Sequence, residues 1–191
     1  MRTVGGMTDG PLTDPKALRA LSHPFRWKLI QLLGEQGPRT ATQCSAVLGE
    51  SVASCSYHLN MLAKYGFVEE VEGPGRQKPW RAVSRRQIIS PEGLDEEGAL
   101  AAEAAGMAFL DQEFERIRER TRQREHVAQE WRDFVGIDGR TMFVTQEEMA
   151  QLHAEMAELL DRFNERTGDP SLRPEGARPV RLFLSVAVAP E

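Results

Sequence analysis

The sequence predicts a mainly helical protein with a small amount of β-structure. Apolar residues recur at helical spacing through most of residues 14–65. A hairpin pattern follows, with the turn Gly73-Pro74-Gly75 between two β-prone arms. A proline-free stretch from Leu94 to about Asp133 then predicts one long helix. The predicted parts are a flexible tail, a compact N-terminal domain, a long helix and a small C-terminal strand-helix-strand segment: residues 1–12, 13–90, 91–135 and 136–191.

Two helices open the region that we expect to be ordered. Segment 14–21 begins with a cap at Thr13 or Asp14, followed by proline at the first helical position, which predicts a short helix. His23-Pro24 interrupts the chain, and the strongly apolar segment 25–33 then predicts a second helix that ends in a glycine-containing stretch. This second helix should form the centre of the N-terminal core. We expect Trp27 to pack in that core or at a subunit contact.

Residues 40–81 predict a helix, a tight turn, a second helix and a basic hairpin, in that order. Gly49 can adopt the left-handed conformation that ends a helix, and Ser51 can cap the next one. This order is typical of a winged helix-turn-helix and indicates DNA binding. A generic helical pair followed by a hairpin is the alternative. The residues expected to be buried are Ala41, Cys44, Val47 and Leu48 on the first helix and Cys55, Leu59 and Leu62 on the second.

Charge is unevenly distributed along the chain. The formal net charge of -5 argues, taken alone, against a nucleic-acid partner. Residues 1–90, however, hold 12 Lys and Arg against 7 Asp and Glu, a net charge of +5. Residues 91–191 hold 12 against 22, a net charge of -10. The basic half can attract phosphates, whereas the acidic half would repel a DNA backbone.

The second helix of the motif, residues 51–65, has one side available for DNA. If its apolar face turns to the core, the opposite face presents small, polar and aromatic residues. Hydroxyl and amide groups can hydrogen-bond base edges, methyl groups suit thymine, and lysine or arginine side chains suit phosphates. The predicted DNA-binding residues are Val52, Ala53, Ser56, Tyr57, Asn60 and Lys64 on this helix and Arg76 and Lys78 on the hairpin.

Three motifs and their spacing resemble a known family. The motifs are Leu21-Ser22-His23-Pro24, Ser56-x-His58-Leu59-x-x-Leu62 and Gly66-Phe67-Val68. Over residues 14–83 the chain resembles the ArsR-type winged-helix transcriptional regulators, which are dimeric bacterial repressors. The resemblance implies that helix 51–65 enters the major groove and that the wing at 69–81 lies along the backbone or in the minor groove. It also implies that His58 is a partly buried histidine that supports the helix.

The resemblance does not extend to the family's operators or metal sites. Val52 and Tyr57 stand where many relatives carry Gln or Arg, so no operator sequence can be transferred. Thiolate sensors need a Cys-x-Cys pair, and this segment has only Cys44. His126 and His153 lack neighbouring ligands at metal-binding spacing. We therefore expect no metal and no cofactor; the alternative is a cryptic site or one shared between subunits.

The predicted long helix carries an apolar stripe. Leu100, Met107 and Phe114 recur every seven residues, with Leu110 and Ile117 in the alternate position. In the resembling family, the helix after the wing pairs with its symmetry mate. We therefore expect a homodimer through this helix and the first helix. The alternative is that the stripe packs on its own subunit.

The C-terminal segment predicts a strand at 140–144, a helix that starts with the capping box Thr145-x-x-Glu148, and a strand at 180–188. Two strands are too few to be stable alone, so they must pair with each other against the helix, with the wing, or with another subunit. Nearby aromatic residues could line a ligand pocket, but a core is the favoured prediction. These residues are Trp131, Phe134, Phe143 and Phe163.

Together these features favour a dimeric, sequence-specific DNA-binding transcriptional regulator that acts as a repressor on an inverted-repeat operator. The alternative is a winged-helix protein-interaction module that does not read DNA. The sequence shows no nucleophile–base pair, phosphate loop or convergent carboxylate pair, so we expect no enzyme. It also shows no apolar run long enough for a membrane helix and no signal core, which predicts a cytoplasmic location. An effector, either a small molecule or a protein, would act through the C-terminal half.

Overall fold

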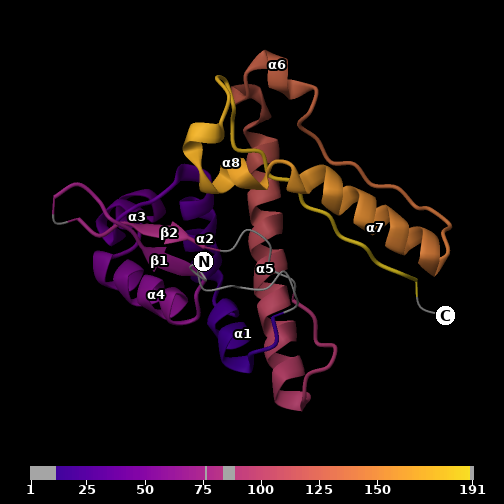
Figure 1. Ribbon diagram of the computed structural model, residues 1–191, viewed down its shortest axis with the longest axis horizontal. Coiled ribbons are helices and arrows are strands. Elements are labelled where there is room, and N and C mark those ends of the chain that lie inside the picture. The colour runs from indigo at the N-terminus through magenta and orange to yellow at the C-terminus, as the bar shows by residue number, and fades with distance from the viewer. Residues whose placement is uncertain (1–11, 76, 84–88, 190–191) are drawn as a thin grey trace, which may run out of the picture. The chain divides into compact units, whose positions relative to one another are not determined.

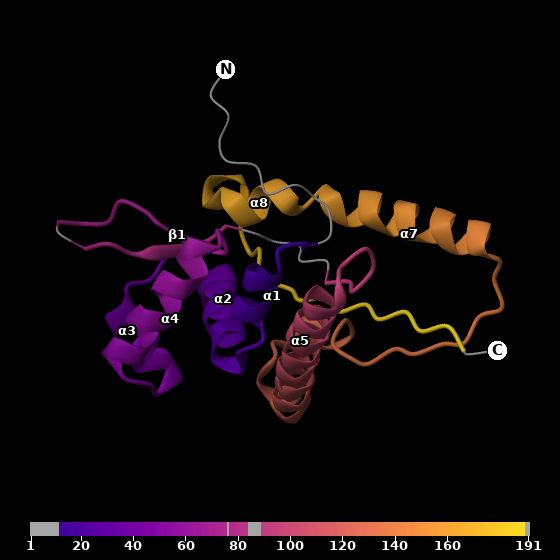
Figure 2. The same ribbon diagram turned by 90° about the horizontal axis from the view of Figure 1, so that it is seen from below.

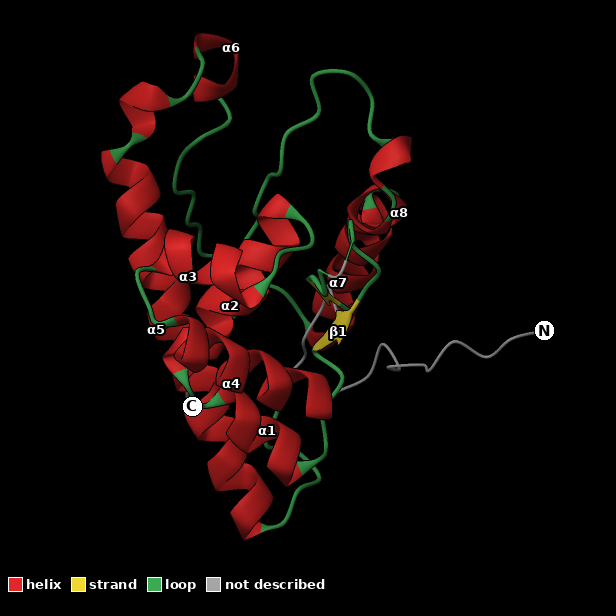
Figure 3. Cartoon of the chain, turned by 90° about the vertical axis from the view of Figure 1, so that its left-hand side faces the viewer, coloured by secondary structure: helices red, strands yellow, loops and turns green. Residues whose placement is uncertain are grey.

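The computed structural model describes residues 12–75, 77–83 and 89–189. The fold class is as predicted, because the described chain is mainly helical with one two-stranded sheet (Figure 1, Figure 3). The tail predicted at residues 1–12 lies outside the described residues, except for Leu12.

The chain divides into two compact units, Met1–Ile117 and Arg118–Glu191. The first unit holds the predicted DNA-binding region and most of the long helix. Its elements are α1 (Pro15–Leu21), α2 (Pro24–Gln36), α3 (Ala41–Leu48), α4 (Val52–Lys64), β1 (Val68–Glu70), β2 (Trp80–Ala82) and α5 (Glu96–Arg122), which continues into the second unit.

Side chains cap the first two helices, α1 at Asp14, one of the two predicted caps, and α2 at His23, which was predicted only to interrupt the chain. The Asp14 carboxylate accepts a hydrogen bond from the Lys16 backbone N–H at 2.9 Å, and Pro15 occupies the first position of α1. His23 caps α2 in the same way, because its Nδ1 accepts from the Phe25 backbone N–H at 3.2 Å. A side chain at each N-terminus thus satisfies a backbone donor that the helix itself leaves unpaired.

The helix-turn-helix forms as predicted, with one exception. Gly49 adopts a left-handed φ of 71° at the end of α3, and the Ser51 hydroxyl accepts from the Ser54 backbone N–H at 3.1 Å to start α4. The apolar faces of the two helices meet with Cys44, Cys55, Leu59 and Leu62 fully buried. Val47 was expected on this buried face, but its side chain is 50% exposed. That prediction was wrong, because α3 buries the side of the helix centred on Cys44 and leaves Val47 at the surface.

The wing follows α4 directly. Gly66 adopts a φ of 75°, which lets the Phe67 backbone N–H reach the Leu62 carbonyl at 3.0 Å and reverses the chain after the helix. β1 and β2 then pair antiparallel, with Glu69 opposite Arg81. Figure 2 shows α3 and α4 side by side, next to this hairpin.

The sequence did not indicate a third extended stretch beside the hairpin. The backbones of Arg39 and Trp80 exchange two hydrogen bonds, at 3.0 and 2.8 Å. This bridge joins the segment before α3 to the outer side of β2. The wing is therefore anchored at both ends of the helix-turn-helix.

The core of the first unit lies between α2, α4 and the N-terminal part of α5. Trp27 is buried as predicted, its ring lies 4.9 Å from that of Phe109, and its Nε1 donates to the Leu21 carbonyl at 2.6 Å. The small residues of α5 pack on this core, whereas three large apolar residues of the predicted stripe stay exposed. The buried residues are Ala101, Ala102, Ala105 and Ala108; the exposed ones are Leu100, Met107 and Phe114.

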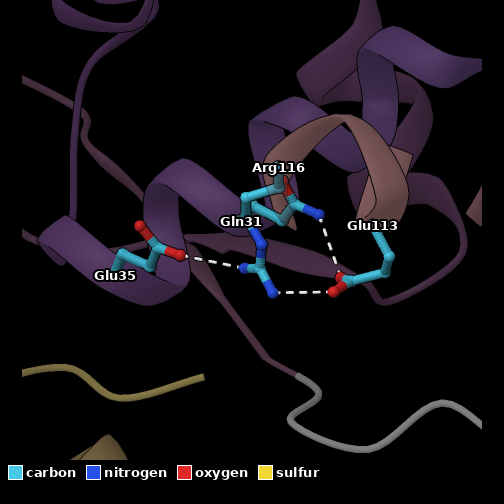
Figure 4. A network of polar contacts seen from close by, with 4 residues as sticks. All are labelled: Gln31, Glu35, Glu113 and Arg116. Carbon is cyan, nitrogen blue, oxygen red and sulfur yellow. Dashed lines mark hydrogen bonds and ion pairs between the residues drawn. The ribbon is translucent and has the colours of Figure 1, made fainter. Parts of the chain in front are cut away.

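A buried polar network joins α2 to α5 (Figure 4). The Arg116 guanidinium lies 2.7 Å from the Glu113 carboxylate and 3.0 Å from that of Glu35. Gln31 donates to the other oxygen of Glu113 at 3.2 Å. Glu113 is fully buried. Its charge is therefore tolerated because two side chains from the adjacent surfaces donate to it.

The long helix is shorter than predicted. It ends at Arg122 instead of near Asp133, and a 3-10 turn at Arg124–His126 and the short α6 (Gln129–Arg132) follow. Residues 118–126 contain no apolar side chain that could pack, and arginines lie four residues apart along them. Like charges at this spacing oppose helix formation, so the helix ends soon after its last apolar residue, Ile117.

The second unit contains the predicted capped helix but not the predicted strands. α7 (Gln146–Asp161) begins with the capping box of Thr145 and Glu148, and α8 (Asn164–Gly168) and a 3-10 turn at Pro170–Leu172 follow. Residues 140–144 and 180–188 were predicted as strands, but neither segment forms a β-ladder with any described part of the chain. A strand requires a ladder of backbone hydrogen bonds to a neighbouring strand, and among the described residues the only such ladder is that of β1 and β2.

The predicted aromatic core of the C-terminal segment is likewise not formed. Phe134 is 82% exposed and Phe143 is fully exposed. Phe163 is about half exposed, and the guanidinium groups of Arg162 and Arg166 lie 5.5 and 5.4 Å from its ring centre. In the single chain these side chains therefore form neither a packed core nor a closed pocket.

Replacing Arg116 by Met should destabilise the fold by about 3 kcal/mol, because it leaves the buried Glu113 carboxylate without its cationic partner. Urea denaturation followed by circular dichroism measures the change in unfolding free energy. Arg122→Met is the matched control, since Arg122 is exposed on the same helix, and we expect it to change stability by less than about 0.5 kcal/mol. Equal effects of the two substitutions would contradict a stabilising role for the network.

Candidate nucleic-acid interface

One face of α4 is buried and the opposite face is open. The core-facing residues are Cys55, His58, Leu59 and Leu62. The positions predicted to meet DNA lie on the other side: Val52, Ala53, Tyr57, Asn60 and Lys64 are exposed, and Ser56 is half-buried. The helix therefore brings the six predicted residues to one surface.

The polar groups on this surface already contact one another. The Asn60 amide donates to the Ser56 carbonyl one turn earlier at 2.8 Å and lies 3.5 Å from the Ser56 hydroxyl. The Lys64 ammonium sits 5.5 Å from the centre of the Tyr65 ring. Asn60 must therefore exchange a local bond within its own helix for any bond to a base edge.

The wing carries cations that are paired with its own carboxylates. Lys78 Nζ lies 3.4 Å from Glu70, and Arg81 pairs with Glu69 across the sheet. Lys78 is exposed, as predicted, and Arg76 lies outside the described residues. Arg81 was not among the residues predicted to meet DNA, although the sequence already placed it on the arm that follows the hairpin turn. The described cations of the wing are thus exposed, and each is paired with a glutamate of the same hairpin.

His58 fixes the position of α4 against the junction between α1 and α2. The Arg26 Nε donates to His58 Nδ1 at 3.3 Å, while Arg26 Nη1 donates to the Ala20 carbonyl at 2.7 Å. The rings of His23 and Phe25 lie 4.5 and 5.1 Å from the His58 ring, respectively. On its outer side the ring meets Tyr57 edge-on at 5.2 Å. The partly buried supporting histidine that the family resemblance implies is therefore present.

The surroundings of His58 favour its neutral form. Burial lowers the pKa of His58, and the nearby His23 and Arg26 lower it further, against a smaller opposing effect of Glu50. The neutral ring accepts a hydrogen bond from Arg26, which a doubly protonated ring could not do.

The two cysteines lie inside the helix-turn-helix. Burial raises the pKa of Cys44 to about 11, with Cys55 adding to the rise, and burial also raises the pKa of Cys55. Both thiols are therefore protonated at neutral pH, and they fill space as small apolar groups. Within the described residues, no group of three or more His, Cys, Asp or Glu side chains is arranged to hold a metal ion.

Comparison with known proteins agrees with this geometry. A family model described as a helix-turn-helix domain matches residues 21–71, a range that includes α2, α3, α4 and β1. The chain therefore carries the helix-turn-helix domain of a DNA-binding regulator. No curated protein matches the chain. Among the described helices, none combines the length and the apolar character needed to span a membrane.

The lowered pKa of His58 predicts a loss of stability in acid. The unfolded chain takes up a proton near pH 6.5, whereas the folded chain resists it until a lower pH. The contribution of His58 is therefore fully present above about pH 6.5 and declines as the pH falls, by at most about 1.4 kcal/mol per pH unit. Urea denaturation at a series of pH values measures this dependence. A His58→Gln chain should lose it, and a His153→Gln chain, altered at an exposed site, should retain it.

Proposed function

We propose that this protein is a homodimeric, sequence-specific transcriptional regulator of the ArsR type, and that it acts as a repressor. The observation that carries the proposal is the open face of α4, which is held by a buried histidine and flanked by a hairpin with exposed cations. Each subunit would place α4 in the major groove of one half-site of an inverted repeat. The proposal assigns the protein no catalytic activity and no cofactor.

The chemistry of the α4 face suits sequence reading. Asn60 can give adenine two hydrogen bonds, and Ser56 can bond either base of a pair. Val52 and Ala53, near the N-terminus of the helix, offer methyl groups to thymine. Lys64 stands at the other end of the helix, where an ammonium group can reach a phosphate. Specificity and positioning are thereby assigned to different residues.

The exposed stripe of α5 supports a dimer. Leu100 and Met107 are 61% and 54% exposed, although the small residues beside them pack on their own subunit. Ile89 and Pro91 extend this apolar surface into an open groove. An exposed apolar helix face whose large residues recur every seven positions is typical of a contact between helices.

The order of charge along α5 favours an antiparallel contact with a second copy. Between residues 91 and 115 the chain has 8 acidic and no basic residues, whereas residues 116–124 have 5 arginines and 1 glutamate. Two such helices side by side in the same direction would set like charges together. An antiparallel pair sets the acidic part of each helix beside the basic part of the other, which also satisfies twofold symmetry.

Replacing Asn60 by Ala should relax base preference at one position of each half-site, by about 1–3 kcal/mol, with little change in non-specific binding. The measurement is selection from random duplexes with the parent and variant proteins, followed by titration of the selected sites. If the parent protein selects no sequence over random DNA at physiological salt, the proposal fails. An unchanged preference in the variant would remove Asn60 from the reading surface.

Replacing Lys78 by Ala should weaken binding to all duplexes alike and reduce the slope of log affinity against log salt by about one, since one phosphate contact is lost. Glu70→Gln should act in the opposite direction, because it frees Lys78 from its carboxylate partner. Lys28→Ala is the matched control, because Lys28 is an exposed lysine of α2 and not part of the wing. Fluorescence anisotropy over a salt series provides both quantities.

The internal charge balance of the wing supports a second candidate function. A hairpin whose lysine and arginine already pair with Glu70 and Glu69 resembles a protein-binding surface as much as a phosphate-binding one. In that case the domain would bind a partner protein without reading DNA. The salt series separates the two, because a protein-interaction module would show no sequence preference and no dependence on Lys78.

A further inference from the structure

Arg39 carries the one buried side-chain donor that has no partner among the described residues. Its Nε is shielded from solvent and makes no hydrogen bond. The two terminal nitrogens of the guanidinium are not shielded, and they too lack a hydrogen bond or ion pair with any described residue. Buried polar atoms of folded proteins are nearly always bonded, so an unbonded one indicates a partner that is not part of the chain.

The charge of Arg39 is not balanced by a carboxylate, in contrast to the described cations of the wing. Lys78 and Arg81 each pair with a glutamate of their own hairpin. Around Arg39, by comparison, the sequence holds no Asp or Glu between Glu35 and Glu50. A phosphate group that reaches Arg39 therefore displaces no carboxylate, whereas one that reaches Lys78 must displace Glu70.

The main chain at Arg39 is fixed where the wing meets α3. Its backbone exchanges two hydrogen bonds with that of Trp80 on β2. The next residue, Thr40, caps α3 by accepting from the Gln43 backbone N–H at 3.2 Å. Directly opposed residues of an antiparallel pair lie on the same face, so Arg39 shares the face of the buried Trp80, which accounts for the shielding of its Nε. Little main-chain freedom is therefore left to lose when this guanidinium binds a ligand.

The first turn of α3 adds neutral hydrogen-bond donors. Thr42 and Gln43 are exposed there. Gln43 uses its amide oxygen to accept from the Thr40 backbone N–H at 2.8 Å, which leaves its amide nitrogen available to donate outward. Hydroxyl and amide donors of this kind commonly bond phosphate oxygens. The Arg39 guanidinium lies near the same turn, since it opposes the rise of the Cys44 pKa to about 11 that burial causes.

We propose that Arg39 binds a phosphate of the DNA backbone and that this contact contributes more to affinity than that of Lys78. The inference rests on the proposed function, and the ligand follows from the place of Arg39 in the motif. In a helix-turn-helix the second helix lies in the major groove while the first crosses the backbone, and α3 is that first helix. A guanidinium is planar, permanently charged and matched to the oxygens of a phosphate.

Replacing Arg39 by Gln should weaken binding to every duplex and lower the slope of log affinity against log salt by about one for each subunit bound. The variant should therefore fall behind the parent by about eightfold per contact between 1 M and 0.1 M salt. Fluorescence anisotropy with a labelled duplex of mixed sequence measures both quantities. Lys28→Gln is the matched control, because it removes an exposed charge of α2 and should leave the slope unchanged.

Two further variants separate a phosphate contact from a structural role. Arg39→Lys keeps the charge and should keep most of the slope, although it loses the planar arrangement of donors. Lys78→Ala should cost less affinity than Arg39→Gln. If Arg39 only supports the fold, Arg39→Gln will lower the unfolding free energy in urea and leave the salt slope at the parent value. That result overturns the proposal, as does an equal effect of Arg39→Gln and Lys28→Gln.

A second measurement locates the contact on the DNA. The duplex is the one that the parent protein selects from random sequences, with its phosphates replaced one at a time by uncharged methylphosphonates. At one position of each half-site, the replacement should weaken binding of the parent but not of Arg39→Gln. Equal losses for both proteins at every position would contradict the assignment.

Failure of this inference is distinct from failure of the proposed function. A parent protein that selects a sequence while Arg39→Gln retains its slope refutes the role of Arg39 alone. A parent protein that binds no duplex in preference to another refutes sequence-specific regulation, and the assignment of Arg39 falls with it.

Discussion

The contact of His58 with the junction between α1 and α2 governs how the proposed reading surface is presented. α4 has an open face only because the opposite face is buried, and His58 is the one polar group on that buried face. Arg26 satisfies the ring nitrogen and at the same time binds the Ala20 carbonyl at the end of α1. One guanidinium therefore holds three helices in register, and the angle at which α4 leaves the core follows from it. A neutral ring is required, because an imidazolium would face Arg26 with like charge.

The exposed charges of the wing are also paired with one another. Lys78 and Arg81 belong to the hairpin that would approach DNA, yet each has a carboxylate partner within the same hairpin. Exposed pairs of this kind contribute little to stability. Their effect is on binding, because a phosphate must displace the glutamate. This exchange lowers the affinity for DNA of any sequence. Base contacts from α4 then contribute a larger share of the binding free energy, which increases sequence preference. A net charge of -5 is compatible with DNA recognition because 22 of the 29 acidic residues lie in residues 91–191, outside the winged helix-turn-helix.

Local rules predicted the N-terminal domain well, and they failed where structure depends on distant partners. Asp14, Ser51 and the capping box at Thr145 each determine a helix start through a bond to a backbone group two or three residues away, so the sequence alone is sufficient. The face of α4 followed from its apolar spacing. The Arg39–Trp80 bridge and the buried Glu113 could not be foreseen, because neither residue carries a local signal for its distant partner. The strands at 140–144 and 180–188 failed for the same reason: alternation predicts a strand but supplies no neighbour for it.

The position of the buried ion pair indicates how the two halves of the chain can be coupled. Arg116 lies on α5, one residue before the end of the first unit, and bridges Glu113 to Glu35 on α2. α2 in turn carries Arg26, which holds His58. Within the first unit, α2 therefore makes polar side-chain contacts both with α5 and with the recognition helix. A contact that shifts α5, whether from a second copy or an effector, would therefore act on α4 through helix α2 instead of through a loop. Closely packed side chains have few alternative arrangements. A small displacement of α5 would therefore either be prevented by the core or move the open face of α4 as a whole.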